Sequence, residues 1–247
     1  MDKEQTGEED MKALVAENLS KSFGGLVAVN KIDITLQVGE VVSVIGPNGA
    51  GKTTLLNLLS GYLRPNEGII RIFGKNVTGL PAEKISRMGV GRTFQQPKIF
   101  KRLSVYENIL VSILNSSSDI KNHKEKARYY TKLFGLTHVM DHEAGAISFG
   151  QQRLLEIARV LASSPKLVLL DEPTAGVHVS LVKKLEEIIL DMKNDGKAVL
   201  IVEHNMPFVA NVSDRVVVMS SGLKIAEGSY EEIRSDINVI EAYLGGR

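Results

Sequence analysis

The chain has 247 residues, of which 43% are hydrophobic and 24% charged, a composition typical of a globular protein. A formal net charge of +1 gives no global electrostatic basis for binding nucleic acid or an anionic membrane. The absence of cysteine excludes disulfides, thiolate metal sites and thiol catalysis, and agrees with a reducing compartment. No apolar run is long enough to span a membrane and the N-terminus lacks a signal-peptide core, so we expect a soluble, cytosolic chain.

Residues 1–11 are predicted to be a disordered acidic tail, because the first ten contain five acidic residues, one lysine and no apolar periodicity. Residues 12–247 are predicted to form a single domain. Its first part has β-branched runs between glycine turns, which are typical of strands. We expect these strands at Ala13–Leu19, Ile32–Leu36, Val41–Ile45 and Glu67–Gly74. Pro81 is expected to start a short helix that ends near Arg87.

From about residue 95 to residue 150 the chain becomes more polar and more helical, and we predict a helical subdomain inserted in the core. Ser104–Leu114 reads as a helix in which Ser104 and Glu107 have the spacing of a capping box. Asn115–Asn122 is expected to be a polar loop, and His123–Phe134 a second helix.

The last hundred residues alternate short apolar runs with amphipathic segments, a pattern typical of a mostly parallel sheet covered by helices. The strands are expected at Val168–Leu170, Ala198–Val202, Val216–Met219 and Lys224–Ala226. The helices are expected at Gly150–Ala162, Ser180–Asn194 and Pro207–Val212, with further helices at the C-terminus. These elements predict an α/β fold.

A glycine-rich segment follows the predicted strand Val41–Ile45 and matches the P-loop pattern G-x-x-x-x-G-K-[ST]. Glycines let the backbone bend around phosphates and turn its N–H groups inward, and a helix N-terminus adds partial positive charge. Lys52 can reach the β- and γ-phosphates, and the Thr53 hydroxyl can bind Mg²⁺. We therefore predict a nucleoside triphosphate site formed by Gly46, Pro47, Asn48, Gly49, Ala50, Gly51, Lys52, Thr53 and Thr54.

Two adjacent acids, Asp171 and Glu172, end a second apolar run. Carboxylates at the carboxyl end of a parallel strand point into the crevice where ligands bind. We predict that Asp171 binds Mg²⁺, directly or through water, and that Glu172 is the general base that polarises the attacking water. An apolar run ending in acids is common, but its pairing with a P-loop favours this interpretation over a helix-capping turn.

Further segments resemble the motifs of ATP-binding cassette (ABC) ATPases, in the order in which that family has them. Ile147–Arg153, which reads ISFGQQR, resembles the signature motif L-S-G-G-Q. Gln95 matches the Q-loop of the family, His204 its switch histidine, and Phe23 the aromatic position that stacks on adenine. The resemblance begins at about Ala13 and covers the rest of the chain. It implies a P-loop NTPase fold with a mostly parallel core sheet, an antiparallel β subdomain and a helical insert.

The resemblance also implies roles for these residues. Ser148 can cap the following helix, and with Gly150 and Gln151 it is expected to contact the ATP of a second subunit in a head-to-tail dimer. Gln95 is expected to contact the metal and the attacking water, and to report the γ-phosphate to the helical insert. His204 is expected to hydrogen-bond the γ-phosphate and to hold the attacking water in place.

Two positions depart from the family pattern. Phe149 replaces the first glycine of the signature motif, which is tolerated only if its side chain points away from the phosphate. His178 stands where the family generally has an aspartate, at the end of the loop Thr174–His178. This second replacement puts the cross-dimer contact of the loop in question.

Within the family, the chain most resembles the ATPases of branched-chain amino-acid uptake, through Glu156–Arg159, Glu203–Met206 and Ile240–Gly245. Lipopolysaccharide-export and urea-uptake ATPases share part of this tail and are alternatives. The implied partners are a second ATPase subunit, transmembrane permease subunits and, indirectly, a substrate-binding protein, at the cytoplasmic face of the inner membrane. ATP and Mg²⁺ are the implied cofactors, and no nucleic-acid partner is expected.

Some ATPases of this fold work without a membrane partner. DNA-repair members contain a very long coiled coil and ribosome-acting members usually contain two cassettes, whereas this sequence has neither feature. An iron–sulfur assembly ATPase is a further alternative, against which the signature motif and the tail argue. A P-loop GTPase or kinase is disfavoured because it would leave the signature motif unexplained.

Overall fold

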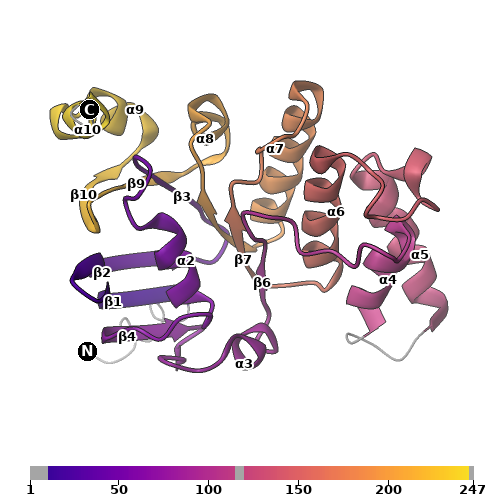
Figure 1. Ribbon diagram of the computed structural model, residues 1–247, viewed down its shortest axis with the longest axis horizontal. Coiled ribbons are helices and arrows are strands. Elements are labelled where there is room, and N and C mark those ends of the chain that lie inside the picture. Colours follow the sequence, from indigo (N-terminus) through magenta and orange to yellow (C-terminus); the bar gives the residue numbers. More distant parts are fainter. Residues whose placement is uncertain (1–10, 115–119, 245–247) are drawn as a thin grey trace.

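The computed structural model describes residues 11–114 and 120–244. The predicted acidic tail, apart from its last residue, and residues 115–119 of the predicted polar loop lie outside the described residues. Two β-sheets and several helices make up the described part of the chain (Figure 1).

The smaller sheet is antiparallel, with the strand order β2-β1-β4-β5. Its strands are β1 (Lys12–Phe23), β2 (Leu26–Gln37), β4 (Glu67–Ile72) and β5 (Lys75–Asn76). Glycine turns separate the strands, and Gly24 and Gly39 adopt the left-handed conformation that such turns need. The predicted antiparallel β subdomain is therefore present.

The larger sheet has the order β10-β9-β3-β8-β7-β6, and all neighbours from β9 to β6 are parallel. Every residue of β3, β8 and β7 is buried, because helices and the smaller sheet cover both faces. This burial explains why these strands are continuous apolar runs. The strands are β3 (Val41–Ile45), β6 (Val90–Arg92), β7 (Leu167–Asp171), β8 (Ala198–Val202), β9 (Arg215–Ser220) and β10 (Leu223–Gly228).

Helix α2 (Lys52–Leu59) lies between the two sheets (Figure 1). Four leucines bury its apolar positions in the core that both sheets share: Leu55, Leu56, Leu58 and Leu59. Because α2 is fixed by this packing, its first residue is held directly beyond the end of β3. The fold thereby places a helix N-terminus at the carboxyl edge of the parallel sheet.

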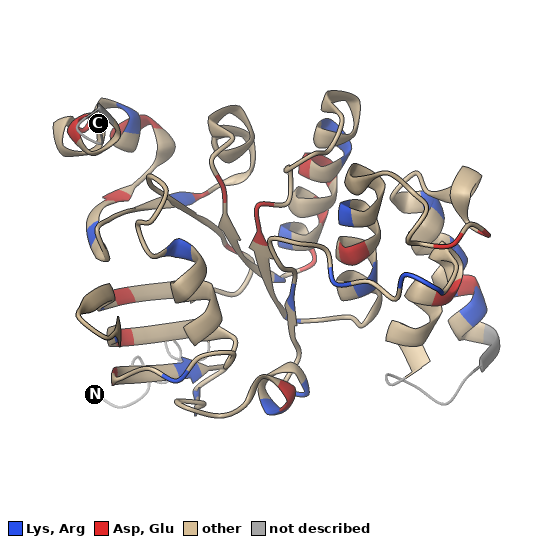
Figure 2. Ribbon diagram, in the orientation of Figure 1, with Lys and Arg blue, Asp and Glu red and all other residues tan. Residues whose placement is uncertain are grey.

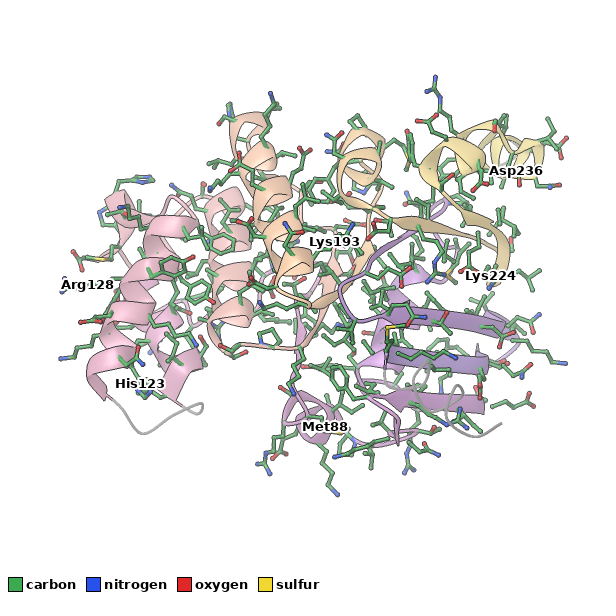
Figure 3. All side chains as sticks on the ribbon, turned by 180° about the vertical axis from the view of Figure 1, so that it is seen from behind. Met88, His123, Arg128, Lys193, Lys224 and Asp236 are labelled. Atoms are coloured by element: carbon green, nitrogen blue, oxygen red, sulfur yellow. The ribbon has the colours of Figure 1, made fainter. Side chains whose placement is uncertain are left out.

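The helices after α3 pack on the other side of the larger sheet or beyond its edge (Figure 1), whereas α3 shares the core of α2 through Ile85. Helix α6 (Phe149–Ala162) lies between α7 (Val179–Asn194) and the pair α4 (Val105–Leu114) and α5 (Ile120–Leu133). The other helices are α3 (Ala82–Ser86), η1 (Thr137–Val139), α8 (Met206–Val212), α9 (Tyr230–Ser235) and α10 (Ile237–Leu244). Figure 3 shows His123 and Arg128 of α5 at one end of the molecule and Lys224 and Asp236 at the other.

Several details differ from the sequence predictions: β1 continues to Phe23, past the predicted end at Leu19, and neither β5 nor η1 was expected. Helix α5 begins at Ile120, so the last part of the predicted loop Asn115–Asn122 is helical; its first turn is too polar to be distinguished from a loop by pattern. Strand β6 was not expected, because three residues around Gly91 show no periodicity. A side chain at Gly91 would meet Val160 at 2.5 Å, so packing requires this glycine. Strand β2 begins at Leu26, before the predicted start.

The predicted capping box at the start of α4 is confirmed. The Ser104 hydroxyl accepts the Glu107 N–H at 3.1 Å, and Glu107 Oε2 accepts the Ser104 N–H at 2.8 Å. Across the two described ranges, no helix combines the length and the apolar character needed to cross a bilayer.

Candidate functional site

The glycine-rich loop has a backbone that side chains would obstruct. Gly46 has φ 148°, and a Cβ there would meet the Met219 carbonyl oxygen at 2.0 Å. Gly51 has φ 99°, and a Cβ there would meet the Ala28 carbonyl oxygen at 2.1 Å. Gly51 is also the N-cap of α2 and supplies no side-chain cap, so the first N–H groups of α2 are available to an anionic ligand.

Lys52 lies at the start of α2 and turns back over the loop. Its ammonium donates hydrogen bonds to the carbonyl oxygens of Gly46, at 2.7 Å, and Pro47, at 2.9 Å. Burial lowers the pKa of Lys52, and the charges of Glu172 and Asp171 oppose that shift. The ammonium is thus held within the loop by two neutral acceptors, which phosphate oxygens can replace with stronger charge-assisted bonds.

Asp171 ends β7 and is almost fully buried, with 1% of its surface exposed. Among the described residues, neither carboxylate oxygen has a hydrogen-bond partner, and the Arg92 Nη2 lies 4.0 Å from Oδ2. Burial raises the pKa of Asp171 to about 6, although the Arg92 charge acts in the opposite direction. Two unpartnered buried carboxylate oxygens beside a P-loop fit the ligand set of a divalent cation.

Glu172 follows β7 in a left-handed conformation, with φ 48°, which is unusual for a residue with a side chain. Its N–H donates to the Val202 carbonyl at 2.9 Å, which ties the end of β7 to the end of β8. His204 lies just beyond β8, and its Nδ1 is 3.9 Å from Glu172 Oε1. The structure thus brings these two predicted residues together, with His204 largely exposed.

Glu203 is a buried residue whose importance the sequence did not reveal. Its Oε1 accepts the N–H of Thr174 at 2.9 Å and the Thr174 hydroxyl at 2.5 Å. Its Oε2 accepts the N–H groups of His204 at 2.8 Å and Asn205 at 3.0 Å. Glu203 therefore joins the loop after Glu172 to the loop that carries His204. The sequence offered one signal for this role: Glu203 directly follows the buried strand β8, whose neighbour β7 also leads into acids.

An open cavity of about 600 Å³ collects most of the predicted nucleotide-binding residues. Phe23, Gln95 and Glu172 line it. The P-loop and the start of α2 contribute Asn48, Gly49, Ala50, Gly51, Lys52, Thr53 and Thr54. Phe23 is 47% exposed, so its ring is available to stack on a base. The remaining lining residues are Leu26, Val27, Ala28 and Ser221.

The signature residues lie elsewhere: the described residues that line this cavity include neither Ser148, Gly150 nor Gln151. Ser148 is the N-cap of α6 and forms a capping box with Gln151. The Ser148 hydroxyl accepts the Gln151 N–H at 3.3 Å, and Gln151 Oε1 accepts the Ser148 N–H at 2.9 Å. A Cβ at Gly150 would meet the Gly176 carbonyl oxygen at 2.4 Å, so this glycine allows the loop after β7 to pack on α6.

The two departures from the family pattern have local explanations. The Phe149 ring is close to Gly176, where an added Cβ would lie 2.6 Å from it, and the Arg153 guanidinium lies 5.7 Å from the ring centre. His178 is the N-cap of α7, and its Nδ1 accepts the Ser180 N–H at 3.3 Å, the bond that an aspartate could also make.

Many P-loop GTPases recognise guanine through a loop with the sequence N-K-x-D. This chain has the same letters at Asn30–Asp33, but they lie within β2. Asp33 Oδ1 accepts the Asn18 N–H at 2.6 Å, so the carboxylate binds the neighbouring strand β1. This segment gives no support to a GTPase.

A P-loop at a helix N-terminus, beside a parallel strand that leads into two acids, defines a nucleoside triphosphatase of the P-loop class. The family model described as ABC transporter matches residues 29–175, and the one described as Branched-chain amino acid ATP-binding cassette transporter matches residues 224–247. The chain belongs to the ABC transporter family, as an ATP-hydrolysing transporter subunit that binds nucleotide.

Individual relatives agree with this assignment. The chain is 38% identical to the high-affinity branched-chain amino acid transport ATP-binding protein LivG of Salmonella typhimurium, over 94% of this chain and 97% of that protein. It is 39% identical to the lipopolysaccharide export system ATP-binding protein LptB of Haemophilus influenzae, over 95% and 98%. A solved structure of the ADP conformation of MJ1267, an ATP-binding cassette of an ABC transporter, superposes with a TM-score of 0.83 at 34% identity, over 95% and 99%.

Proposed function

We propose that the chain powers the uptake of branched-chain amino acids through a permease, by closing as a head-to-tail dimer around two ATP molecules. One observation carries the dimer: the cavity that collects Phe23, the P-loop, Gln95 and Glu172 lacks the signature residues. A second copy can supply Ser148, Gly150 and Gln151 from the start of its own α6. The LivG relative supports the branched-chain substrate class.

In the proposed reaction, Lys52 leaves its loop carbonyls and binds the β- and γ-phosphates, while Phe23 stacks on adenine. Mg²⁺, held by Thr53, Gln95 and Asp171, would neutralise charge on the phosphate oxygens. Glu172 accepts a proton from water as the water oxygen bonds to the γ-phosphorus.

The bond between the γ-phosphorus and the bridging oxygen then breaks, and that oxygen leaves with ADP. His204 donates a hydrogen bond to the γ-phosphate. Its Nδ1 lies 3.9 Å from Glu172 Oε1, close enough to hold the Glu172 side chain in place. Product release would reopen the dimer and return the permease to its resting state.

We assign contact with the permease to the surface around a second cavity, of about 340 Å³, which adjoins the Q-loop. Tyr62, Arg92 and Phe94 line it, and the rings of Tyr62 and Phe94 meet edge to face at 5.0 Å. Arg92 also lies 4.0 Å from Asp171 and therefore connects this surface to the metal-binding acid. The working complex is proposed to lie at the cytoplasmic face of the inner membrane, with a substrate-binding protein delivering the amino acid.

Transport by the assembled complex tests the proposal. The chain is purified with candidate permease subunits and reconstituted in vesicles, and ATP-dependent movement of labelled leucine, isoleucine and valine is measured. Movement of all three that is lost with Glu172→Gln supports the proposal. ATP-dependent movement of urea or lipopolysaccharide without movement of these amino acids would instead support one of the alternative ABC transporters. Copurification with an iron–sulfur assembly complex and no permease would support the alternative without a membrane partner.

A further inference from the structure

Helix α6 carries three charged residues, and all of them contact the chain segment around Gln95. These are Arg153, Glu156 and Arg159, the residues that colour α6 in Figure 2. Arg153 is fully buried and Glu156 is 3% exposed. Charges leave water at such positions only when they are paired and hydrogen-bonded, so their partners identify what this part of α6 holds.

Arg153 binds two consecutive backbone carbonyls of the Q-loop. Its Nη1 donates to the Phe94 oxygen and its Nη2 to the Gln95 oxygen. Nη1 also donates to Glu156 Oε2 at 3.1 Å, one turn along the same helix. The planar guanidinium presents its donors in a fixed fork, so two bonded carbonyls fix both the position and the direction of the backbone at Gln95.

Glu156 binds the same segment from its N–H side. Its Oε1 accepts the Lys98 N–H at 2.8 Å and the Phe94 N–H at 3.3 Å. Burial raises the pKa of Glu156, while the Lys98 amide and the Arg153 charge oppose the shift. Arg159 adds a bond to the Lys98 carbonyl. The backbone from Phe94 to Lys98 is therefore held on both sides of Gln95.

The segment and the helix lead to two different phosphate-facing positions. The Gln95 side chain borders the nucleotide cavity, whereas α6 begins at Ser148, outside it. Arg153 is five positions after Ser148, which caps the same helix, so its bonds join the Q-loop backbone to the helix that starts at the signature residues.

We propose that Arg153 and Glu156 are positioning residues for ATP hydrolysis, which clamp the Gln95 backbone to α6 so that Gln95 and Ser148 keep one relative geometry. The proposal deepens the proposed function and rests on the roles given there to Gln95 and Ser148. When Gln95 engages the metal ion and the attacking water beside the γ-phosphate, the clamp brings the signature end of α6 along with it.

A double-mutant cycle on the full chain tests the kinetic part. Arg153→Met is expected to lower kcat by about tenfold or more with a change of less than about threefold in the KM for ATP, because it misplaces Gln95 rather than removing a binding group. If Arg153 acts through Gln95, then Arg153→Met combined with Gln95→Ala is no slower than Gln95→Ala alone. Arg153→Lys, which keeps a cationic donor, should restore part of kcat. Multiplicative losses in the double variant would overturn the proposal.

Two further variants separate positioning from stability. Arg153→Met/Glu156→Leu removes both buried charges, which avoids leaving Glu156 unpaired. Its kcat should be as low as that of Arg153→Met. When it is combined with Gln95→Ala, kcat should again be no lower than that of Gln95→Ala alone. Leu155→Ala removes a fully buried apolar side chain from the same helix, where it packs in the apolar cluster. Its effect on kcat should multiply with that of Gln95→Ala, as expected for a residue that only stabilises the helix.

Amide hydrogen exchange of the nucleotide-free chain tests the clamp without ATP, and so separates its failure from a failure of the proposed function. The Lys98 and Phe94 amides should be protected in the unaltered chain. Arg153→Met/Glu156→Leu should accelerate their exchange by about tenfold or more, while amides of β7 keep their rates. Leu155→Ala should not accelerate these two amides selectively. Unchanged Lys98 exchange in the double variant would refute the clamp, even if the chain hydrolyses ATP as proposed.

Discussion

The P-loop region and the signature region are both predicted to face phosphate, yet their local structures are opposite in character. In the P-loop region, Lys52 donates to two neutral carbonyls, neither Asp171 oxygen has a hydrogen-bond partner among the described residues, and Glu172 has a left-handed backbone. In the signature region, Ser148 and Gln151 satisfy each other in a complete capping box.

This difference shows what each region needs from a ligand. The P-loop region holds charges in an arrangement that a nucleotide and its metal ion would complete, which is the property of a preorganised site. The signature region has its helix start satisfied within the chain, and we propose that it adds its N-terminal field to a phosphate delivered by another molecule. On this proposal the P-loop region can be recognised within a single chain, and the role of the signature region only with a partner.

The largest expected effect comes from removing the cation of the P-loop region. Lys52→Ala should reduce ATP affinity by at least about 3 kcal/mol, beyond calorimetric detection, because the loop amides alone would face the phosphate charge. Lys75→Ala, an exposed lysine of β5, is the matched control and should bind ATP normally. Near-normal ATP affinity of Lys52→Ala would show that the P-loop region does not bind the nucleotide phosphates through this cation.

The burial of Asp171 without a hydrogen-bond partner among the described residues predicts a gain in stability when its charge is removed. The folded pKa is about 6 against an ordinary 3.8, so the folded chain binds this proton more tightly, and stability is lost as pH rises from about 4 to about 6. Asp171→Asn should therefore raise the free energy of unfolding by about 3 kcal/mol at pH 7.5, and by about half of that at pH 5.

Urea unfolding without nucleotide and with EDTA measures this difference. The same variant should lose Mg²⁺-dependent ATP hydrolysis. If Asp171→Asn is less stable than the original chain at pH 7.5, the Asp171 carboxylate makes stabilising contacts in solution, and its burial does not destabilise the nucleotide-free chain.

A smaller effect is expected at the edge of the cavity. Phe23→Ala should weaken ATP and GTP by similar amounts, about 1–3 kcal/mol each, because an aromatic ring stacks on any base. Phe100→Ala removes a ring of similar exposure that does not line the nucleotide cavity, and should leave both affinities unchanged. Calorimetric titration of both variants with both nucleotides checks this, and a loss confined to ATP would indicate recognition of the base edge instead.

The same comparison explains how much the sequence could predict. The P-loop is a local pattern, and its pairing with the two acids at the end of β7 favours one interpretation of those acids, so roles for Lys52, Asp171 and Glu172 could be predicted from short segments alone. The contacts proposed as the clamp could not be predicted, because Arg153 binds a carbonyl 58 positions away in the sequence. The bond between Glu203 and Thr174 could not be predicted either, because 29 positions separate them. Charged residues in an amphipathic helix usually face solvent, and only the packing of α6 reveals that Arg153 and Glu156 are buried. Strand β6 was missed for a related reason: its pairing with β7, which is distant in the sequence, makes it a strand, and its own three residues show no strand pattern.

We propose that the P-loop region of one chain and the signature region of another form one site, and the oligomeric state with ATP tests this proposal most directly. Glu172→Gln should slow hydrolysis while leaving both phosphate-facing regions intact, so size-exclusion chromatography with ATP should show a dimer, and with ADP a monomer. Adding Ser148→Arg should abolish the dimer, because a bulky side chain would obstruct the nucleotide of the partner, while each monomer still binds ATP through Lys52. An ATP-dependent dimer that persists unchanged with Ser148→Arg would contradict the account, because its interface could not then include the start of α6.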